Sequence, residues 1–161
     1  MGTTHAQFAM ENQLVSIDTP ILREEALDVK FPWKGAESLN ALASRLWDAC
    51  ARERGLGLAA NQIGIPLKMA VISTPTRKLA VVNPRILVAK GACILVREGC
   101  LSLPGKEFMV PRYMSLRVAY NDLTGKLKVL DLVGLDAQVF QHELDHLRGR
   151  LISDYKELQN V

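Results

Sequence analysis

Residues 141–146 read Gln141-His142-Glu143-Leu144-Asp145-His146, which places two imidazoles four positions apart with a carboxylate directly after the first. On a helix, positions i and i+4 project from one face, so His142 and His146 can hold one metal ion while Glu143 reaches water beside it. The alternative is a solvated helix on which two histidines recur by chance. Only one other histidine, His5, occurs in the chain, and the flanking pattern is helical. The stretch therefore predicts a central metal-binding helix.

A catalytic metal site of this type needs a third protein ligand and one open position. The chain offers Cys100, which lies in the segment Glu98-Gly99-Cys100-Leu101-Ser102, after an apolar run and before the turn signal Pro104-Gly105. A thiolate beside two neutral imidazoles is a ligand set suited to Zn²⁺ or Fe²⁺. Taken alone, Cys100 would more often be a small buried hydrophobe, but the histidine pair reverses that expectation.

The third unusual segment is Gly55-Leu56-Gly57-Leu58-Ala59-Ala60-Asn61-Gln62. Its glycine spacing matches the dinucleotide-binding fingerprint, yet that motif requires a preceding strand and a following helix. Here a predicted helix precedes the segment and Pro66 follows closely, so nicotinamide or flavin binding is disfavoured. A simple turn would explain the glycines alone. We expect instead that they let the backbone approach a bound ligand, with Gln62 directed at the chemistry.

Together the three segments resemble the peptide deformylase family, and the similarity runs from about Leu14 to about Tyr155. The resemblance implies a hydrolase that removes the N-formyl group from the initiator methionine of nascent polypeptides and releases formate. It also implies one divalent metal ion per chain, held by Cys100, His142 and His146. The native ion is expected to be Fe²⁺, with Zn²⁺ or Ni²⁺ able to occupy purified protein.

The resemblance also assigns roles in amide hydrolysis. An ion in this site would acidify water near neutral pH, and Glu143 would accept the proton and deliver it to the leaving amine. Donors for the oxyanion are the Gln62 side-chain amide and the backbone N–H of Leu101. Leu135, Val139 and the two histidines share a helix face, so the substrate pocket should adjoin the metal. The residues expected at this pocket are Leu56, Gly57, Glu98, Gly99, Leu135, Gln138 and Val139.

Two features depart from the family pattern. Gln138 stands where many relatives have an aliphatic residue, which predicts a more polar pocket rim and a broader substrate preference. We expect its amide to face water or the substrate backbone. Many bacterial members also continue into a long C-terminal helix used in docking to the ribosome, whereas this chain ends seven residues after Asp154. Ribosome contact is therefore left open, and a compact form of the family is expected.

Composition agrees with a small enzyme acting in the cytoplasm, expected to be monomeric. The chain has 161 residues, a net charge of +3 and three cysteines, an odd number that favours a reducing compartment. Its basic residues are scattered, so a direct nucleic-acid substrate is not expected. No apolar run is long enough to span a membrane, and the first twenty residues lack the features of a signal peptide.

Hydrophobic periodicity predicts an α+β fold, with short antiparallel or mixed β-sheets packed around the metal-binding helix. An amphipathic helix is expected over residues 36–54, with Cys50 in the core and Gly55 in the left-handed position that ends the helix. A hairpin loop is expected at 121–125 and the second helix from about Gly134 to Leu147. Residues 1–161 should form a single catalytic domain in which 1–12 are disordered. The expected strands are 68–73, 79–83, 92–96, 115–120 and 127–132.

Two other functions stay open at this point. A metallopeptidase that cleaves internal peptide bonds would use similar chemistry, but such enzymes commonly take a third His or Glu as ligand, which the Cys100 segment does not fit. A catalytically silent binding protein with a structural metal is the second alternative. A closed structural site needs a fourth protein ligand and no general base, so Glu143 and Gln62 count against it. Asp145 is near in sequence but should project away from the metal-binding face.

Overall fold

The computed structural model describes residues 12–157, and its elements belong to the predicted α+β class. Two α-helices occur in this range, α2 (Leu39–Arg52) and α3 (Leu135–Leu147), together with short 3-10 turns. Apart from Asn12, the segment expected to be disordered lies outside the described residues. The 3-10 turns are η1 (Pro20–Arg23), η2 (Ala60–Ile63) and η3 (Ile152–Asp154), and the strands are β1 (Gly57–Ala59), β2 (Met69–Ser73), β3 (Lys78–Cys100), β4 (Leu103–Asn121), β5 (Leu127–Val133) and β6 (Lys156–Glu157).

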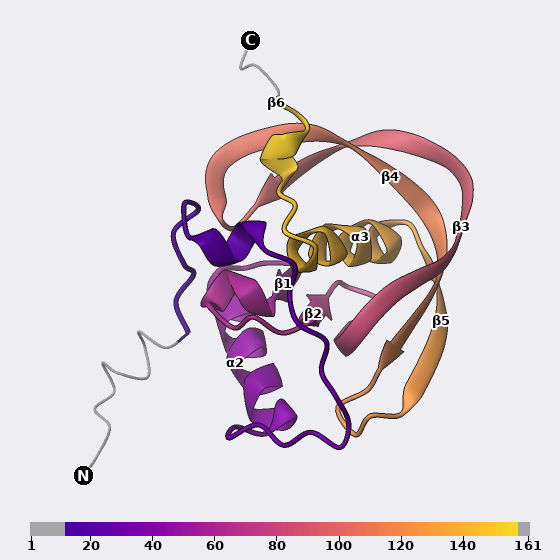
Figure 1. Ribbon diagram of the computed structural model, residues 1–161. Coiled ribbons are helices and arrows are strands. Elements are labelled where there is room, and N and C mark those ends of the chain that lie inside the picture. Colours follow the sequence, from indigo (N-terminus) through magenta and orange to yellow (C-terminus); the bar gives the residue numbers. More distant parts are fainter. Residues whose placement is uncertain (1–11, 158–161) are drawn as a thin grey trace.

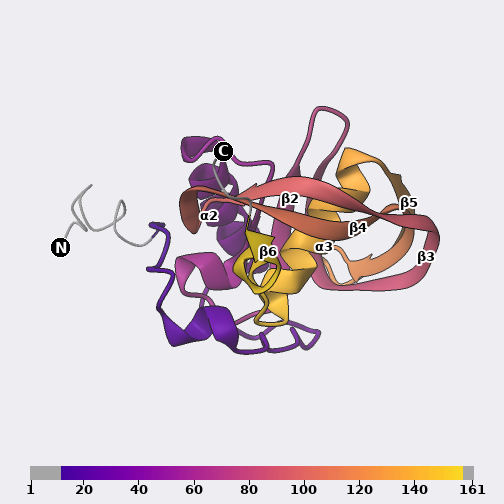
Figure 2. The same cartoon turned by 90° about the horizontal axis from the view of Figure 1, so that it is seen from above.

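The strands pair antiparallel in the order β1-β2-β3-β4-β5, and β6 pairs with the first part of β4. Figure 1 shows the long β3–β4 hairpin curving around α3, while α2 lies on the side of β1 and β2. The view from above shows the same arrangement, with α3 beneath the β3–β4 ribbon (Figure 2). Register shifts along β3 allow so long a hairpin to bend. Helix α3 is therefore enclosed by the curved β3–β4 hairpin.

The sequence prediction was wrong about the extent of the two long strands. Residues 79–83 and 92–96 were expected as separate strands, but both belong to β3, which has 23 residues. Gly91 adopts a φ of 76° at a register shift between Lys90 and Cys93, so this glycine bends the strand without ending it. Pro104 and Gly105 lie inside β4, and the turn between the two strands falls earlier, at residues 101–102.

Helix α2 begins and ends for identifiable local reasons. The Ser38 hydroxyl accepts a hydrogen bond from the Ala41 N–H at 3.1 Å, which caps the first turn. Cys50 is 1% exposed, so its predicted place in the core is confirmed. The expectation for Gly55 was wrong, because Arg54 takes the left-handed conformation with φ 54°. Gly55 is instead a close-packing position, since a Cβ there would lie 2.7 Å from the Leu101 side chain.

The hairpin loop between β4 and β5 is confirmed. Asn121 pairs with Leu127, and the Asp122 carboxylate accepts hydrogen bonds from the N–H groups of Thr124 and Lys126. Gly125 has a φ of 94°, a conformation that favours glycine. This loop fixes the register of β5 against β4 and so places residues 134–135, where α3 begins.

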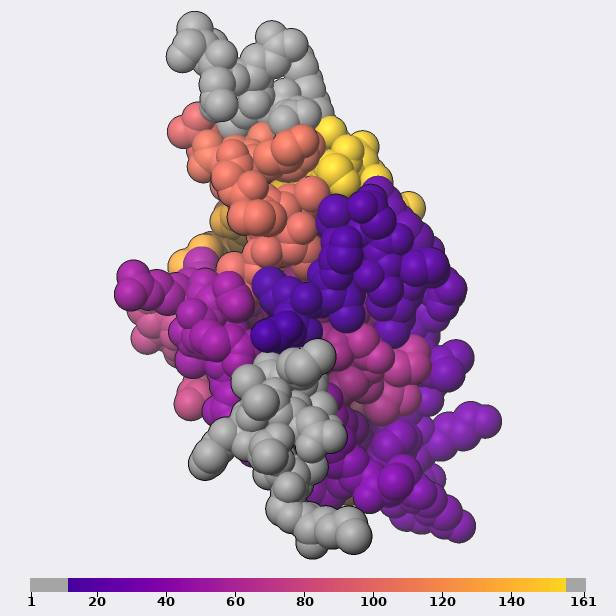
Figure 3. Space-filling model, turned by 90° about the vertical axis from the view of Figure 1, so that its left-hand side faces the viewer, coloured from indigo at the N-terminus to yellow at the C-terminus, as the bar shows by residue number. Residues whose placement is uncertain are grey.

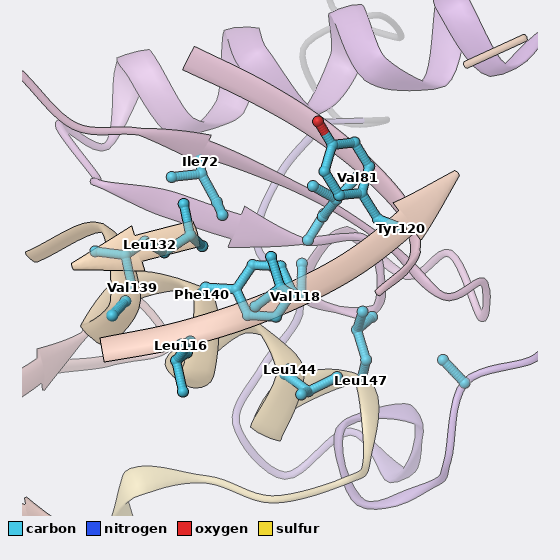
Figure 4. Close-up of a cluster of buried hydrophobic side chains, with 14 residues drawn as sticks. Ile72, Val81, Leu116, Val118, Tyr120, Leu132, Val139, Phe140, Leu144 and Leu147 are labelled. Carbon is cyan, nitrogen blue, oxygen red and sulfur yellow. The ribbon is translucent and has the colours of Figure 1, made fainter. Parts of the chain in front are cut away.

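One apolar cluster lies between α3 and the sheet. Figure 4 shows Phe140 of α3 lying close to Val118 of β4, with Leu116, Leu144 and Leu147 also in the cluster. These side chains are at most 5% exposed, and burying each one contributes roughly 1.5 to 3 kcal/mol. A second cluster packs α2 against β1 and β2. Helix α3 thus packs on the sheet through its apolar residues.

The N-terminal segment ties together elements that are distant in sequence. The Val15 N–H donates to the Gln62 carbonyl at 2.9 Å, and the Ala26 N–H donates to the Leu147 carbonyl at 2.9 Å. Figure 3 shows this segment, in indigo, between the yellow C-terminal part of the chain and the magenta part that contains η2. Its backbone therefore restrains both the turn that contains Gln62 and the end of α3. None of the helices in residues 12–157 is long and apolar enough to cross a membrane.

Candidate active site

Three predicted ligand atoms meet where the end of β3 faces α3. His142 and His146 lie one turn apart on α3, with their Nε2 atoms 3.2 Å from each other. The Cys100 sulfur lies 3.4 Å from Nε2 of His146, and all three ligand atoms are within 4.8 Å of one another. A tetrahedral ion with bonds of about 2.0 Å to nitrogen and about 2.3 Å to sulfur keeps its ligands about 3.3 to 3.6 Å apart. The donor set therefore fits a single metal ion.

The Glu98 carboxylate orients the first histidine. Glu98 Oε1 lies 2.9 Å from Nδ1 of His142, and the same carboxylate accepts two hydrogen bonds from Arg112 at 2.8 and 2.9 Å. Burial alone would raise the pKa of Glu98, but hydrogen bonds from Arg112 and His142 outweigh it and lower the pKa to about 2. The carboxylate is therefore ionised and accepts the Nδ1 proton, which leaves Nε2 of His142 available to a metal.

The two imidazoles respond differently to their surroundings. Burial disfavours the charged form of His142, but the contacts with Cys100 and Glu98 outweigh this and raise its pKa to about 10. Burial lowers the pKa of His146 well below its ordinary value, and the neighbouring charge of His142 adds to this effect. The surroundings therefore favour one positive charge among the three donors, but they disfavour protonation of both imidazole rings. A divalent ion would provide that charge with both rings neutral.

Glu143 lies next to the ligands and is almost fully buried. Its Oε2 atom has no hydrogen-bond partner among the described residues, and burial raises its pKa to about 7. A Cβ at Gly57 would lie 2.7 Å from Glu143 Oε1 and 2.9 Å from a Val139 methyl group. The absence of a side chain at Gly57 therefore gives β1 room beside Glu143. An unpartnered buried carboxylate with a pKa near neutrality is suited to accepting and returning a proton.

Gln62 lies on η2 with its amide held in one orientation. Its Oε1 accepts a hydrogen bond from the Ala59 N–H at 3.0 Å, so its NH₂ group points the other way. That NH₂ group donates to the Ser102 hydroxyl at 3.0 Å and lies 4.0 Å from the Cys100 sulfur. Leu101, the other predicted oxyanion donor, is half-buried and lines the same cavity. Both predicted donors are therefore beside the metal-binding group.

A cavity of about 530 Å³ opens beside these groups. Leu56 and Leu135 lie at its mouth, 44% and 41% exposed, while Val139 is buried deeper. Gln138 is half-buried, and its amide donates to Glu98 Oε2 at 3.2 Å, so part of its hydrogen-bonding capacity is used inside the protein. Every residue predicted for the substrate pocket lines this cavity, namely Leu56, Gly57, Glu98, Gly99, Leu135, Gln138 and Val139.

Three residues that support the site were not predicted from the sequence. Arg112 is 2% exposed and joins Glu98 to Asp145, whose Oδ2 accepts from Nη1 at 2.6 Å. Asn61 donates to the His146 carbonyl at 2.6 Å, and Ser102 accepts from Gln62. A signal for Arg112 exists, because the residues at two and four positions before it, Val110 and Phe108, are apolar and buried. An arginine that continues such an alternation is expected to point inward.

A Cys/His₂ donor group, an adjacent unpartnered carboxylate and an open cavity together define a metal-dependent hydrolase. The model of the polypeptide deformylase family matches residues 11–160, and the chain belongs to this family. Membership of a hydrolase family counts against the catalytically silent alternative.

Individual relatives agree with this assignment. The chain is 40% identical over 149 residues to a peptide deformylase of Bartonella tribocorum, covering 88% of this chain and 82% of the relative. The crystal structure of peptide deformylase from Thermotoga maritima matches with a TM-score of 0.83 at 34% identity, covering 89% of this chain and 96% of that one. A deformylase of the Vibrio parahaemolyticus bacteriophage VP16T, crystallised with actinonin, matches with a TM-score of 0.80 at 32% identity, covering 87% and 99% of the two chains.

Proposed function

We propose that the protein removes the N-formyl group from the initiator methionine of nascent polypeptides and releases formate. The observation that most supports this function is Glu143, a buried carboxylate that lines the cavity next to His142 and whose Oε2 has no partner among residues 12–157. Family membership supplies the substrate class. A metallopeptidase acting on internal bonds is less well supported, because the third donor is Cys100 rather than His or Glu.

Cys100, His142 and His146 are the proposed metal ligands, and Fe²⁺ is the proposed native ion. A divalent ion held there supplies Lewis acidity to a carbonyl oxygen and lowers the pKa of water. Zn²⁺ and Ni²⁺ suit the same donors and are expected in protein purified in air. Metal analysis of protein purified under argon tests the choice of ion. A preparation that contains zinc and no iron would contradict the proposal of iron.

In the proposed mechanism, Glu143 moves the protons. It accepts a proton from the attacking water and passes it to the amine as the amide bond breaks, which suits a carboxyl whose pKa is raised to about 7. The Gln62 NH₂ group and the Leu101 N–H stabilise the negative charge that develops on the carbonyl oxygen. The hydrogen bond from Ala59 to Gln62 keeps this donor oriented before substrate binds.

The cavity also accounts for the proposed substrate. A formyl carbon bears only hydrogen, so it fits beside the buried donors where a bulkier acyl group is excluded. The methionine side chain is proposed to lie among Leu56, Leu135 and Val139. The rest of the peptide then extends along residues 97–100, which pair with β4 on one side and line the cavity on the other. An extended peptide can bind such an edge through backbone hydrogen bonds.

We propose that residues 1–161 act as one catalytic domain, as a monomer, in the cytoplasm where nascent chains emerge. Residues 12–157 contain the whole proposed site, so the activity should not depend on a partner chain.

Formate release from formyl-Met-Ala-Ser, followed with formate dehydrogenase, tests the function directly. Acetyl-Met-Ala-Ser serves as the matched substrate control, because it differs only by a methyl group on the acyl carbon. We expect rapid turnover of the formyl peptide and little of the acetyl peptide. Cys100→Ser should lower metal content and activity together. Equal hydrolysis of both peptides, or cleavage after methionine, would contradict the proposed function.

A further inference from the structure

Arg97 is a charged residue at the cavity whose side chain faces outward. Along the end of β3, Glu98 and Cys100 point inward and are 5% and 8% exposed. Arg97 alternates with them, and its side chain is 67% exposed, although the residue lines the cavity. The two acidic residues that line the cavity, Glu98 and Glu143, are buried and belong to the site already described. Arg97 therefore places an exposed positive charge beside the cavity, where part of a bound ligand that extends out of the cavity can contact it.

The geometry of an extended peptide specifies which of its residues meets Arg97. Successive side chains of an extended chain point to opposite sides. If the methionine side chain points inward, on the side of Glu98 and Cys100, the next side chain points outward. That is the side on which Arg97 projects from β3.

We infer that Arg97 selects substrates by charge and favours formyl-methionyl peptides with aspartate or glutamate as the second residue. This inference rests on the proposed function, because it assumes a formylated peptide in the cavity. A guanidinium carries five N–H donors in a planar arrangement that matches a carboxylate. Arg97 is thus a specificity-determining residue and takes no part in breaking the amide bond.

Glu107 modulates this effect. Its Oε2 lies 3.0 Å from Nε of Arg97 across the β3–β4 hairpin, and its side chain is 50% exposed. The pair orients the guanidinium through one edge, but the carboxylate also offsets part of its positive charge. Removal of the Glu107 charge should therefore strengthen the preference for an acidic second residue.

The expected effect is modest because both groups are solvated. Exposed ion pairs are weak, so we expect kcat/KM for an aspartate peptide to exceed that for a lysine peptide roughly two- to five-fold at low salt. The difference should arise mainly in KM, since Arg97 does not touch the reacting atoms. It should shrink as salt is raised toward 0.5 M, because exposed charges are screened.

The test compares formyl-Met-Asp-Ser, formyl-Met-Asn-Ser and formyl-Met-Lys-Ser with the full-length metal-loaded enzyme. Arg97→Glu should reverse the order of kcat/KM, and Glu107→Gln should increase the preference for aspartate. Arg85→Glu is the matched control, because Arg85 is exposed on β3, does not line the cavity and gives the same change in net charge. The control should keep the wild-type order.

The outcomes separate this inference from the proposed function. Formate released from all three peptides at equal kcat/KM by the wild type would overturn the role of Arg97 and leave deformylation intact. The same holds if Arg85→Glu and Arg97→Glu change the preference equally, since the effect would then come from net charge. No formate from any of the peptides would instead defeat the proposed function.

Discussion

Helix α3 has two buried faces, one apolar and one polar, and they are stabilised in different ways. Phe140 and Leu144 pack on β4 in an apolar cluster that needs no particular partner atom. On the polar face, His142 and Glu143 line the cavity and His146 is buried beside them, and a buried polar group costs free energy unless it is hydrogen-bonded. Burial of the apolar face therefore stabilises the position of α3, and this offsets the free-energy cost of burying polar groups on the other face.

The partners of the polar face come from distant parts of the chain. Glu98 reaches His142 from β3, and Asn61 holds the His146 carbonyl from η2. Glu143 Oε2 and His146 Nδ1 remain without partners among residues 12–157. Unpaired buried groups of this kind typically cost roughly 1 to 3 kcal/mol each. This difference between the faces predicts that substitutions on one should affect turnover and substitutions on the other should affect stability.

The largest effect on turnover is expected at Glu143. Glu143→Ala should retain metal and lose on the order of 10²- to 10⁴-fold in kcat, because the site would lack its proton carrier. Formate release and metal content should be measured on the same preparations. A variant with full metal content and wild-type turnover would show that Glu143 is not the proton carrier. The free energy of unfolding should change little, because the lost carboxylate group has an unpartnered oxygen.

On the apolar face the expected result is the opposite. Phe140→Ala should lower the free energy of unfolding by roughly 3 to 5 kcal/mol, because it leaves a cavity in the apolar cluster between α3 and the sheet. Turnover per folded molecule should stay near the wild-type value. Urea denaturation followed by tryptophan fluorescence measures the change.

Leu127→Ala is the matched control for this stability experiment. Leu127 lies on β5 and is 53% exposed, so its truncation should change the free energy of unfolding by less than about 0.5 kcal/mol. If the two variants lost equal stability, the apolar face of α3 would not be the principal support of the helix.

A third prediction concerns a polar residue outside α3. Gln62→Ala should lower kcat on the order of 10²- to 10³-fold through loss of an oxyanion donor. KM should change little, because the missing interaction is made mainly in the transition state. Gln13→Ala provides a control, since Gln13 is an exposed glutamine outside the cavity. Equal kcat values for wild type and Gln62→Ala would remove Gln62 from the mechanism.

The sequence predicted the parts of the site that are local in the chain. His142, Glu143 and His146 follow from helical spacing, and the three motifs indicated Cys100 and Gln62. Arg112 was missed because its partners, Glu98 and Asp145, become neighbours only through the β3–β4 hairpin and the docking of α3. The spacing of residues within one element contains no information about an ion-pair network that joins three elements. Its inward position on β4 was the one available signal.

The fold was predicted correctly where periodicity was regular and wrongly where glycine interrupted it. Both α-helices and the β4–β5 loop lie where expected. Two separate strands were expected at 79–83 and 92–96, yet the pairing with β4 continues on both sides of Gly91. A glycine marks either a bend or an end, and the choice depends on whether a partner strand is present. The end of α2 shows the same limit, because Arg54 took the conformation expected of Gly55.

The smallest expected effect lies at Gln138, on the same face of α3 as His142. Gln138 lines the cavity one turn before His142, and its amide donates to Glu98. Gln138→Ile would make the cavity more apolar and remove one of several hydrogen bonds to Glu98, which Arg112 continues to hold. KM for formyl-Met peptides should therefore fall roughly two- to five-fold more than KM for peptides with a polar first residue, in line with about 1 kcal/mol of apolar burial.

Gln138→Glu and Gln138→Leu extend this last experiment. The leucine variant should match the isoleucine variant if apolar character alone sets the preference. The glutamate variant places a second carboxylate beside Glu98, so it should weaken binding of both substrate classes and lower metal content as well. If Gln138→Ile leaves the ratio of kcat/KM for the two substrate classes unchanged, Gln138 does not contact the first side chain. Selectivity would then depend on Leu56, Leu135 and Val139, and the polar face would end at His142.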